Sequence, residues 1–171
     1  MHSAIESESN IGLLISNYRS DNIYPLLPLL SQEFPNWSMD KIKNYVKLVI
    51  SEEKEDNDPS GILVAQNDAL YYVGLLIYTY QTITSNLLAK DNKEEFVNGI
   101  VVENLNASSP ILQKNVFFIL LESLIKIAKK NNCDFIELPK IDETYELIEK
   151  KYKEQIVHPN NFRSFINLKT N

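Results

Sequence analysis

The sequence is short of the residues that build disulfides and polyanion-binding surfaces. Its only cysteine, Cys133, cannot form a disulfide within the chain, and its place at the start of an apolar segment predicts a buried thiol and not a nucleophile. Only two arginines, Arg19 and Arg163, stand among the 17 basic residues, and the formal net charge is −6. An acidic, lysine-dominated balance of this kind argues against nucleic-acid binding.

Long apolar runs are missing as well. No stretch approaches the length of a membrane span, and the first ten residues lack the basic start and apolar centre of a secretory signal. We therefore expect a cytoplasmic protein without membrane association. The two histidines, His2 and His158, lie far apart in the sequence, and no spacing is typical of zinc binding or of Ser/His/Asp catalysis. We predict no metal site.

The chain does contain enough apolar material for one continuous core. With 171 residues, 44% of them hydrophobic, it fits one globular domain over residues 1–171. Periodicity and turn residues predict an element order of strand, two helices, three strands, helix, strand, helix, strand. These elements are a strand over 11–16, a short irregular helix broken by Pro25 and Pro28, a helix capped by Ser38, two strands within 61–84 with a turn at Asn67-Asp68, a strand over 96–105, a helix after Ser109-Pro110, a strand over 133–138, a helix over 139–157 and a strand over 162–170. The acidic segment 51–61 is expected to be a solvated loop.

The most informative stretch runs from Glu95 to Leu138. It reads as a strand, a loop, a long amphipathic helix and a second strand, the order that builds a cofactor-binding βαβ unit. Ser109-Pro110 is a helix-start signature, because serine accepts from unpaired backbone amides and proline at the first position has no amide to satisfy. The spacing predicts that the helix begins there or within the next few residues.

This stretch resembles the corresponding helix and strand of the GNAT-type N-acyltransferase superfamily. The resemblance is carried by Leu120, Leu121, Leu124 and Ala128, followed by Asn132-Cys133 and a strand. The predicted element order is also the GNAT order, so the resemblance covers nearly the whole chain. It implies an α+β fold with a mixed, mostly antiparallel central sheet flanked by helices. It also implies an N-acyltransferase that moves an acetyl or other acyl group from acetyl-CoA, or another acyl-CoA, to an amine.

The sequence departs from the family at the phosphate-binding loop. In GNAT proteins an Arg/Gln-x-x-Gly-x-Gly/Ala loop precedes the helix, and its backbone amides hold the pyrophosphate of acetyl-coenzyme A. Here Asn115 and Phe117 stand where the family has two small residues, and a bulky residue obstructs the approach of phosphate to the backbone. As a replacement we expect the free amides of Ile111 and Leu112, with Lys114 as a nearby cation.

The resemblance also places the reacting groups. In the family, the central strands splay apart at a bulge, and the pantetheine arm of the cofactor pairs with the fourth strand, here Ile100, Val101 and Val102. Glu103 follows at the point where the splay exposes a side chain, so it is the candidate general base. The alternative is that Glu103 is the first polar residue of a loop.

A tyrosine on the helix after the fifth strand often serves the family as the acid that faces the cofactor sulfur. Tyr152 is the nearest match in this sequence, and Tyr145 lies two turns earlier on the same helical face. The alternative for both is core packing with the hydroxyl at the boundary. The tyrosine-rich hairpin, with Tyr71, Tyr72, Tyr78 and Tyr80, is expected to line either an acceptor pocket or the surface of a homodimer. Because alternate strand residues point to opposite faces, only half of these tyrosines can do either.

Three functional hypotheses remain. The leading one is an active N-acyltransferase whose acceptor is a small-molecule or peptide amine. The second, which Asn115 and Phe117 favour, is a catalytically inactive GNAT-like binding or structural module that has lost coenzyme A phosphate binding. The third is a different α+β interaction domain, which would be favoured if the strand after Leu138 did not lie beside the strand that begins at Phe96.

Overall fold

The computed structural model describes residues 12–20, 22–50, 60–85, 95–139, 143–158 and 162–169. A mixed sheet runs through them in the order β1-β2-β3-β4-β5-β7-β6. Its strands are β1 (Leu14–Asn17), β2 (Gly61–Gln66), β3 (Tyr72–Ser85), β4 (Glu95–Ala107), β5 (Phe135–Pro139), β6 (Ile156–Val157) and β7 (Arg163–Asn167). The helices are the 3₁₀ helix η1 (Tyr24–Leu26), α2 (Leu27–Glu33), α3 (Met39–Val49), α4 (Gln113–Lys130), the 3₁₀ helix η2 (Glu143–Tyr145) and α5 (Glu146–Tyr152). Within the described residues, only the β4–β5 pairing is parallel.

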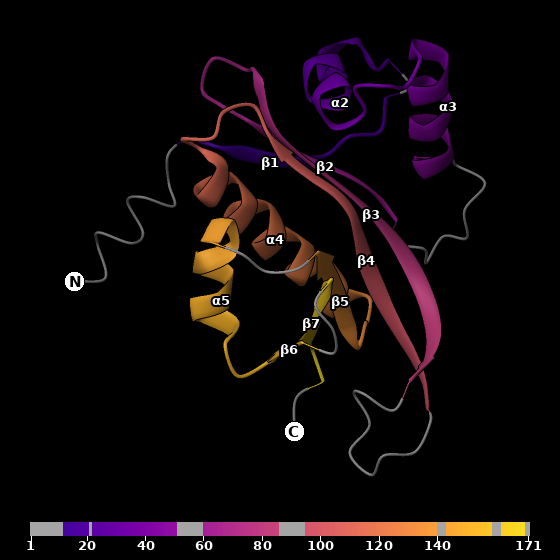
Figure 1. Ribbon diagram of the computed structural model, residues 1–171, viewed down its shortest axis with the longest axis vertical. Helices are drawn as coiled ribbons and strands as arrows, with labels where there is room; N and C mark the ends of the chain where they lie inside the picture. The colour runs from indigo at the N-terminus through magenta and orange to yellow at the C-terminus, as the bar shows by residue number, and fades with distance from the viewer. Residues whose placement is uncertain are drawn as a thin grey trace.

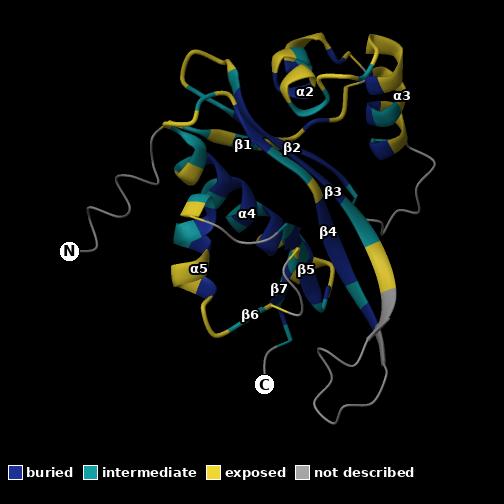
Figure 2. Ribbon diagram, viewed as in Figure 1, coloured by how far each residue is buried: buried dark blue, intermediate teal, exposed yellow. Residues whose placement is uncertain are grey.

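The helices cover the sheet from two sides (Figure 1). α4 and α5 pack on one face over the larger apolar cluster, whereas α2 and α3 pack on the other face over β2 and β3. Figure 2 shows the buried strand segments that lie between these layers. This arrangement confirms the expected GNAT-like order of elements. The strand after Leu138, β7, pairs with β5 and not with β4, so the adjacency expected for it was wrong, because β5 inserts between them and itself pairs with β4 in parallel.

The first half of the chain follows its local signals. Pro25 and Pro28 each stand in the first turn of a short helix, η1 and α2, where a missing amide costs nothing. Ser38 caps α3, and its Oγ accepts from the backbone amide of Lys41 at 3.2 Å. The predicted irregular helix and the predicted cap are therefore both confirmed.

The connection between β2 and β3 is longer than the predicted two-residue turn. It spans residues 67–71, with the Leu70 amide donating to the Asn67 carbonyl at 2.9 Å and the Tyr71 amide donating to Asn67 Oδ1 at 3.0 Å. Leu70 has a φ of 65°, in the left-handed region. The side chain of Asn67 holds the wider turn by replacing a backbone acceptor.

The last predicted helix is also shorter than expected. It ends at Tyr152, and Ile156–Val157 form β6 against Phe165 and Ile166 of β7. The open edge of β7 has unpaired backbone groups. Ile156 and Val157 pair with these groups as a strand, which another turn of helix could not do. Residues 51–59, 86–94, 140–142 and 159–161, which include most of the acidic loop and Pro159, lie outside the described residues.

Candidate functional site

The central feature of the site is a short parallel pairing between β4 and β5. It covers Gly99 with Phe135, Ile100 with Ile136, and Val101 with Glu137, and the register goes no further. Glycine is required at the first position, because a Cβ on Gly99 would lie 2.3 Å from the Phe135 ring. β4 continues to Ala107 while β5 ends at Pro139, so the two strands part beyond Val101. We call the space between their diverging ends the splay.

A β-bulge interrupts β4 at the start of the splay. Tyr78 of β3 pairs with Val102 and Ile77 pairs with Asn104, which leaves Glu103 as the extra residue. The Glu103 side chain is exposed, and its Oε1 accepts a hydrogen bond from Thr79 Oγ1 at 2.8 Å. The structure therefore contains the bulge that the resemblance implied, with a carboxylate on it.

Two residues from the opposite layer face the bulge. With Glu103 and Asn104, the residues Glu33 at the end of α2 and Tyr45 of α3 form what we call the bulge cluster. The Asn104 amide satisfies both its ends when its Nδ2 donates to Glu33 Oε1 at 2.8 Å and its oxygen faces the Tyr45 hydroxyl at 3.4 Å. Burial raises the pKa of Glu33, and it also raises the pKa of Tyr45, with a further contribution from the negative charge of Glu103.

An aromatic corner holds the bulge cluster in place. Phe34 stacks on Trp37 with ring centroids 4.3 Å apart, and Tyr45 meets both rings edge-on at 5.5 and 5.6 Å. Phe34 directly follows Glu33, so the corner fixes where α2 ends and where Tyr45 points. No sequence pattern links these residues to Glu103, because helical periodicity alone does not tell which strand a helix covers.

Arg163 of β7 crosses the splay. Its Nε lies 3.1 Å from Glu137 Oε1 on β5, and its Nη2 donates to the Val102 carbonyl of β4 at 3.2 Å. The side chains of Ile100, Val101 and Val102 are buried, so these expected cofactor-binding residues can reach a ligand only through their backbone. Because Arg163 donates to it, the Val102 carbonyl already has a hydrogen-bond partner. Sequence reasoning missed Arg163, which lies 60 residues from the bulge in the chain.

The loop before α4 differs from the expected phosphate site. The Ile111 amide donates to Ser109 Oγ at 3.3 Å and the Leu112 amide to the Ser109 carbonyl at 3.2 Å, so the prediction that both are free is wrong. Ser109 closes a turn and delays the helix to Gln113, which is within the predicted range. In the described part of the chain, no group accepts from the amides of Lys114 and Asn115.

Some side chains at the start of α4 already have partners within the protein. Lys114 Nζ lies 3.1 Å from Glu146 Oε2, and Lys150 holds the other oxygen of Glu146 at 2.9 Å. Hydrogen bonds from Lys150 and then from Lys114 lower the pKa of Glu146. Phe117 is buried with its ring 5.6 Å from Tyr145, so its bulk lies in the core. Asn115 lines a cavity of about 380 Å³ on the side of the β2–β3 turn.

The two candidate acids have different surroundings. The Tyr152 hydroxyl donates to Glu122 Oε1 of α4 at 2.7 Å, and burial, together with that carboxylate, raises the pKa of Tyr152. Tyr145 lies at the start of α5, beside Phe117, the fifth residue of α4. Seven residues separate the two tyrosines, or about 10 Å along a helix. Tyr145 therefore lies at the start of α5 and Tyr152 at its end.

The expected hairpin tyrosines do not act as one surface. Tyr78 is buried and its hydroxyl donates to Asn17 Oδ1 at 3.2 Å, so it lines neither an acceptor pocket nor an exposed interface. Tyr72 meets Tyr18 edge-on at 5.8 Å, and Tyr71 is exposed in the turn.

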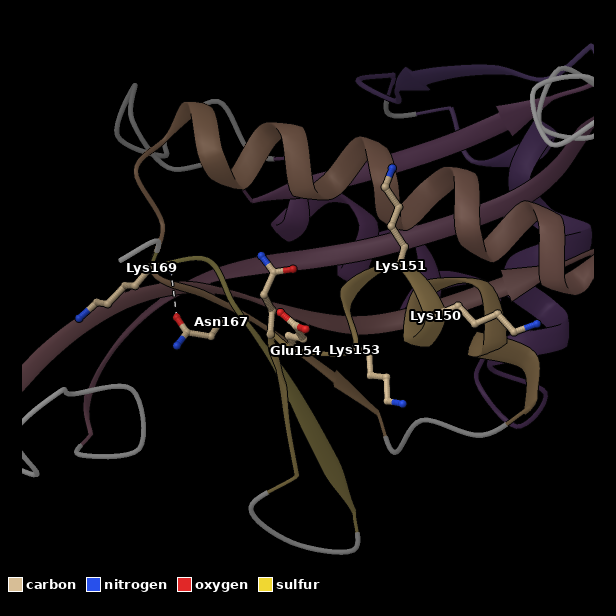
Figure 3. Close-up of a pocket in the computed structure, with 7 residues that line it drawn as sticks. Lys150, Lys151, Lys153, Glu154, Asn167 and Lys169 are labelled. Carbon is tan, nitrogen blue, oxygen red and sulfur yellow. Dashed lines mark hydrogen bonds between the residues drawn. The ribbon is translucent and has the colours of Figure 1, made fainter. Parts of the chain in front are cut away.

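A lysine-lined hollow of about 630 Å³ lies at the other end of α5. Figure 3 shows that Lys150, Lys151, Lys153 and Lys169 extend in different directions from it. Lys150 pairs with Glu146, and Lys151 pairs with Glu122 at 2.8 Å. The ammonium groups therefore do not converge on one anion. Among the described residues no helix is long and apolar enough to cross a membrane, and no group of His, Cys, Asp and Glu is placed to hold a metal ion.

Comparison with solved structures identifies the architecture. A GNAT-family acetyltransferase from Staphylococcus aureus Mu50 matches with a TM-score of 0.56 at 16% identity, over 92% of this chain and 99% of that one. The NatC complex bound to Gag peptide and CoA matches at 0.57 and 10% identity, over 92% and 99%. AAC(6')-Iy with the bisubstrate analog CoA-S-monomethyl-acetylneamine matches at 0.59 and 10% identity, over 83% and 88%.

These likenesses show the fold. The chain has the fold of the GNAT acetyltransferases, as the sequence predicted. No protein-family model matches the sequence. No curated protein matches it either.

Proposed function

We propose that this chain, which has the GNAT fold, is an N-acyltransferase that moves an acetyl or other acyl group from acyl-coenzyme A to an amine. The observation that carries the proposal is the bulge at Glu103, where β4 and β5 part. It combines an exposed carboxylate with backbone groups beyond the last paired residue, Val101. A direct transfer needs both features in one place, a base for the amine and a strand that can hold the acyl donor.

The acyl donor would bind along the splay and at the start of α4. Of the expected residues Ile100, Val101 and Val102, only Val102 lies beyond the pairing with β5, so its backbone would hold the pantetheine arm. The amides of Lys114 and Asn115, at the positive end of the α4 dipole, would receive the pyrophosphate, with the Lys114 ammonium beside them. Ile111 and Leu112 would border this site without donating to it, because their amides are already bonded within the loop.

The reaction can be assigned to residues. Glu103 takes a proton from the substrate ammonium, and the freed lone pair attacks the thioester carbonyl carbon. The new C–N bond forms, the C–S bond breaks, and its electron pair leaves on sulfur. Tyr145 donates a proton to that thiolate and regains one from solvent, while the second amine proton also leaves to solvent. Tyr145 is assigned this role because it stands at the start of α5, the helix that follows β5, whereas Tyr152 lies at the end of that helix.

The charge of the bulge cluster supports a cationic acceptor. Glu33 and Glu103 bring two carboxyl groups to the face of the sheet that α2 and α3 cover, beside the Tyr45 hydroxyl. A small-molecule or peptide amine would be attracted there as an ammonium ion and would lose its proton on arrival.

A thiol-release assay tests the proposal. Purified protein would be mixed with acetyl-coenzyme A and a panel of primary amines and short peptides, and free thiol would be followed over time with product detection by mass spectrometry. We expect amine-dependent thiol release with an acetylated product. Hydrolysis without acetylated amine, or no release with any acceptor class, would argue against the function.

The second candidate is a GNAT-like module without catalysis. Two observations favour it: Arg163 already bonds the Val102 carbonyl, and Glu146 neutralises Lys114. Such a module would not bind acetyl-coenzyme A even at millimolar concentration, and that property separates the two functions.

A further inference from the structure

Arg163 occupies the backbone group that the proposed acyl donor would need. The Asn98 carbonyl accepts from the Asp134 amide at 2.6 Å, so it faces β5. Backbone carbonyls alternate in direction along a strand, and those of Ile100 and Val102 therefore face the same side. Val102 is the first of these beyond the paired residues, and its carbonyl points into the splay, where Arg163 Nη2 donates to it at 3.2 Å.

The guanidinium ties the two strands together at the point where they part. Its Nε bonds Glu137, which is the last β5 residue paired with β4, and its Nη2 bonds Val102. The Arg163 and Glu137 side chains are 30% and 23% exposed, so the bridge is partly buried and solvent reaches part of it. A ligand entering the splay would meet it directly.

We infer that Arg163 is a displaceable bridge, which holds the Val102 carbonyl until the amide of an incoming pantetheine arm replaces it. The inference rests on the proposed function, because it concerns the same acyl donor. The bond to a neutral carbonyl is the weaker end of the bridge, and the ion pair with Glu137 is the stronger. Arg163 can therefore release the Val102 carbonyl while it keeps its ion pair with Glu137 of β5.

The bridge has a measurable consequence for affinity. Each acyl-coenzyme A molecule that binds must break the hydrogen bond from Arg163 to the Val102 carbonyl before it can form its own. Part of its binding free energy is therefore lost. A net hydrogen bond changes stability by about 1 kcal/mol. Removing the guanidinium should therefore lower the Kd for coenzyme A by about five-fold, which is about 1 kcal/mol.

The chain offers a matched control for this test. Arg19 is exposed and is the only other arginine. Arg163→Gln and Arg19→Gln remove the same charge, so their difference isolates the bridge from the general loss of attraction for an anion. Arg163→Lys is the second variant, because it keeps the charge and loses the planar fork that bonds Glu137 and Val102 together.

Calorimetric titration with coenzyme A is the first measurement. We expect tighter binding to Arg163→Gln than to Arg19→Gln, with Arg163→Lys closer to Arg163→Gln than to wild type. Binding to Arg163→Gln alone would also support the bridge, as a fully closed one. If wild type binds coenzyme A and Arg163→Gln binds it equally well or more weakly, the bridge is overturned and the proposed function stays intact. Binding to no variant would contradict both.

Nuclear magnetic resonance gives a readout that needs no substitution. With only two arginines in the chain, nitrogen-15 labelling of arginine gives two side-chain Nε–H signals, one each from Arg163 and Arg19. Pantetheine, which carries no phosphate, is the probe. We expect it to shift the Arg163 signal and leave that of Arg19 in place. Coenzyme A binding with an unmoved Arg163 signal would overturn the inference.

Discussion

The bulge side of the splay and the start of α4 differ in how much of the expected chemistry they keep. At the bulge, Glu103 is exposed and Glu33 lies nearby with a raised pKa. At the start of α4, two amides are bonded within the loop and the Lys114 ammonium pairs with Glu146. The comparison teaches that one chain of this fold can keep an exposed carboxylate on the β4 bulge while the loop before α4 departs from the family's phosphate-binding pattern.

Removing the base carboxylate should have the largest effect. Glu103→Gln keeps the hydrogen bond from Thr79 but cannot take a proton from an ammonium. We expect kcat to fall by about 10²–10⁴-fold with little change in coenzyme A affinity. Glu149→Gln, on the exposed side of α5, is the matched control and should keep full activity. Equal kcat values in the two variants would remove Glu103 from the mechanism.

Disrupting the β4–β5 pairing that precedes the splay should have the next largest effect. Gly99→Ala forces a Cβ to within 2.3 Å of the Phe135 ring, so β4 and β5 must move apart. We expect a loss of about 1–3 kcal/mol in the free energy of unfolding, measured by urea denaturation. Gly61→Ala, where the nearest atom is the Tyr78 hydroxyl at 3.1 Å, should cost less. The opposite ranking would mean that the strands pair differently.

The ion pair at the start of α4 should have a moderate effect on affinity. Lys114→Glu should weaken coenzyme A binding several-fold, and Glu146→Gln should strengthen it, because the second change frees the lysine for phosphate. Raising the salt concentration should reduce both changes. If neither variant differs from wild type in a calorimetric titration, the phosphates are bound elsewhere.

The smallest expected effect concerns Glu33. Burial raises its pKa in the folded state above 4.5, so the folded protein holds this proton more tightly than the unfolded chain. Its contribution to stability is present below about pH 4.5 and is lost as pH rises through the folded pKa. Glu33→Gln should therefore stabilise the protein at pH 7 by less than about 1 kcal/mol, because the carboxyl is only partly buried. Urea denaturation at pH 7 and below about pH 4.5 should show that the stabilisation by Glu33→Gln is present at pH 7 and absent in acid.

Much of the fold could be predicted because its signals are local. Ser38 caps α3 through its own side chain, and the Pro25 and Pro28 positions follow from a missing amide. The end of α5 could not be predicted, because Ile156 and Val157 leave the helix for an edge that only the folded β7 provides.

The site was predictable where it follows the strand and not where it joins distant parts of the chain. Glu103 was found because it ends an apolar run, and the structure places it on a bulge. Arg163, Glu33 and Tyr45 meet β4 only through tertiary packing, and no spacing in the sequence marks them. The amides of Ile111 and Leu112 were misjudged because Ser109 bonds the loop locally before the helix begins.

The most direct test of the account is a calorimetric titration of the purified protein with acetyl-coenzyme A, with dephospho-coenzyme A as the comparison. The account predicts saturable binding with a micromolar Kd despite Asn115 and Phe117 in the loop. Absence of binding at millimolar ligand would contradict it and would make the chain a GNAT-fold module without acyl transfer.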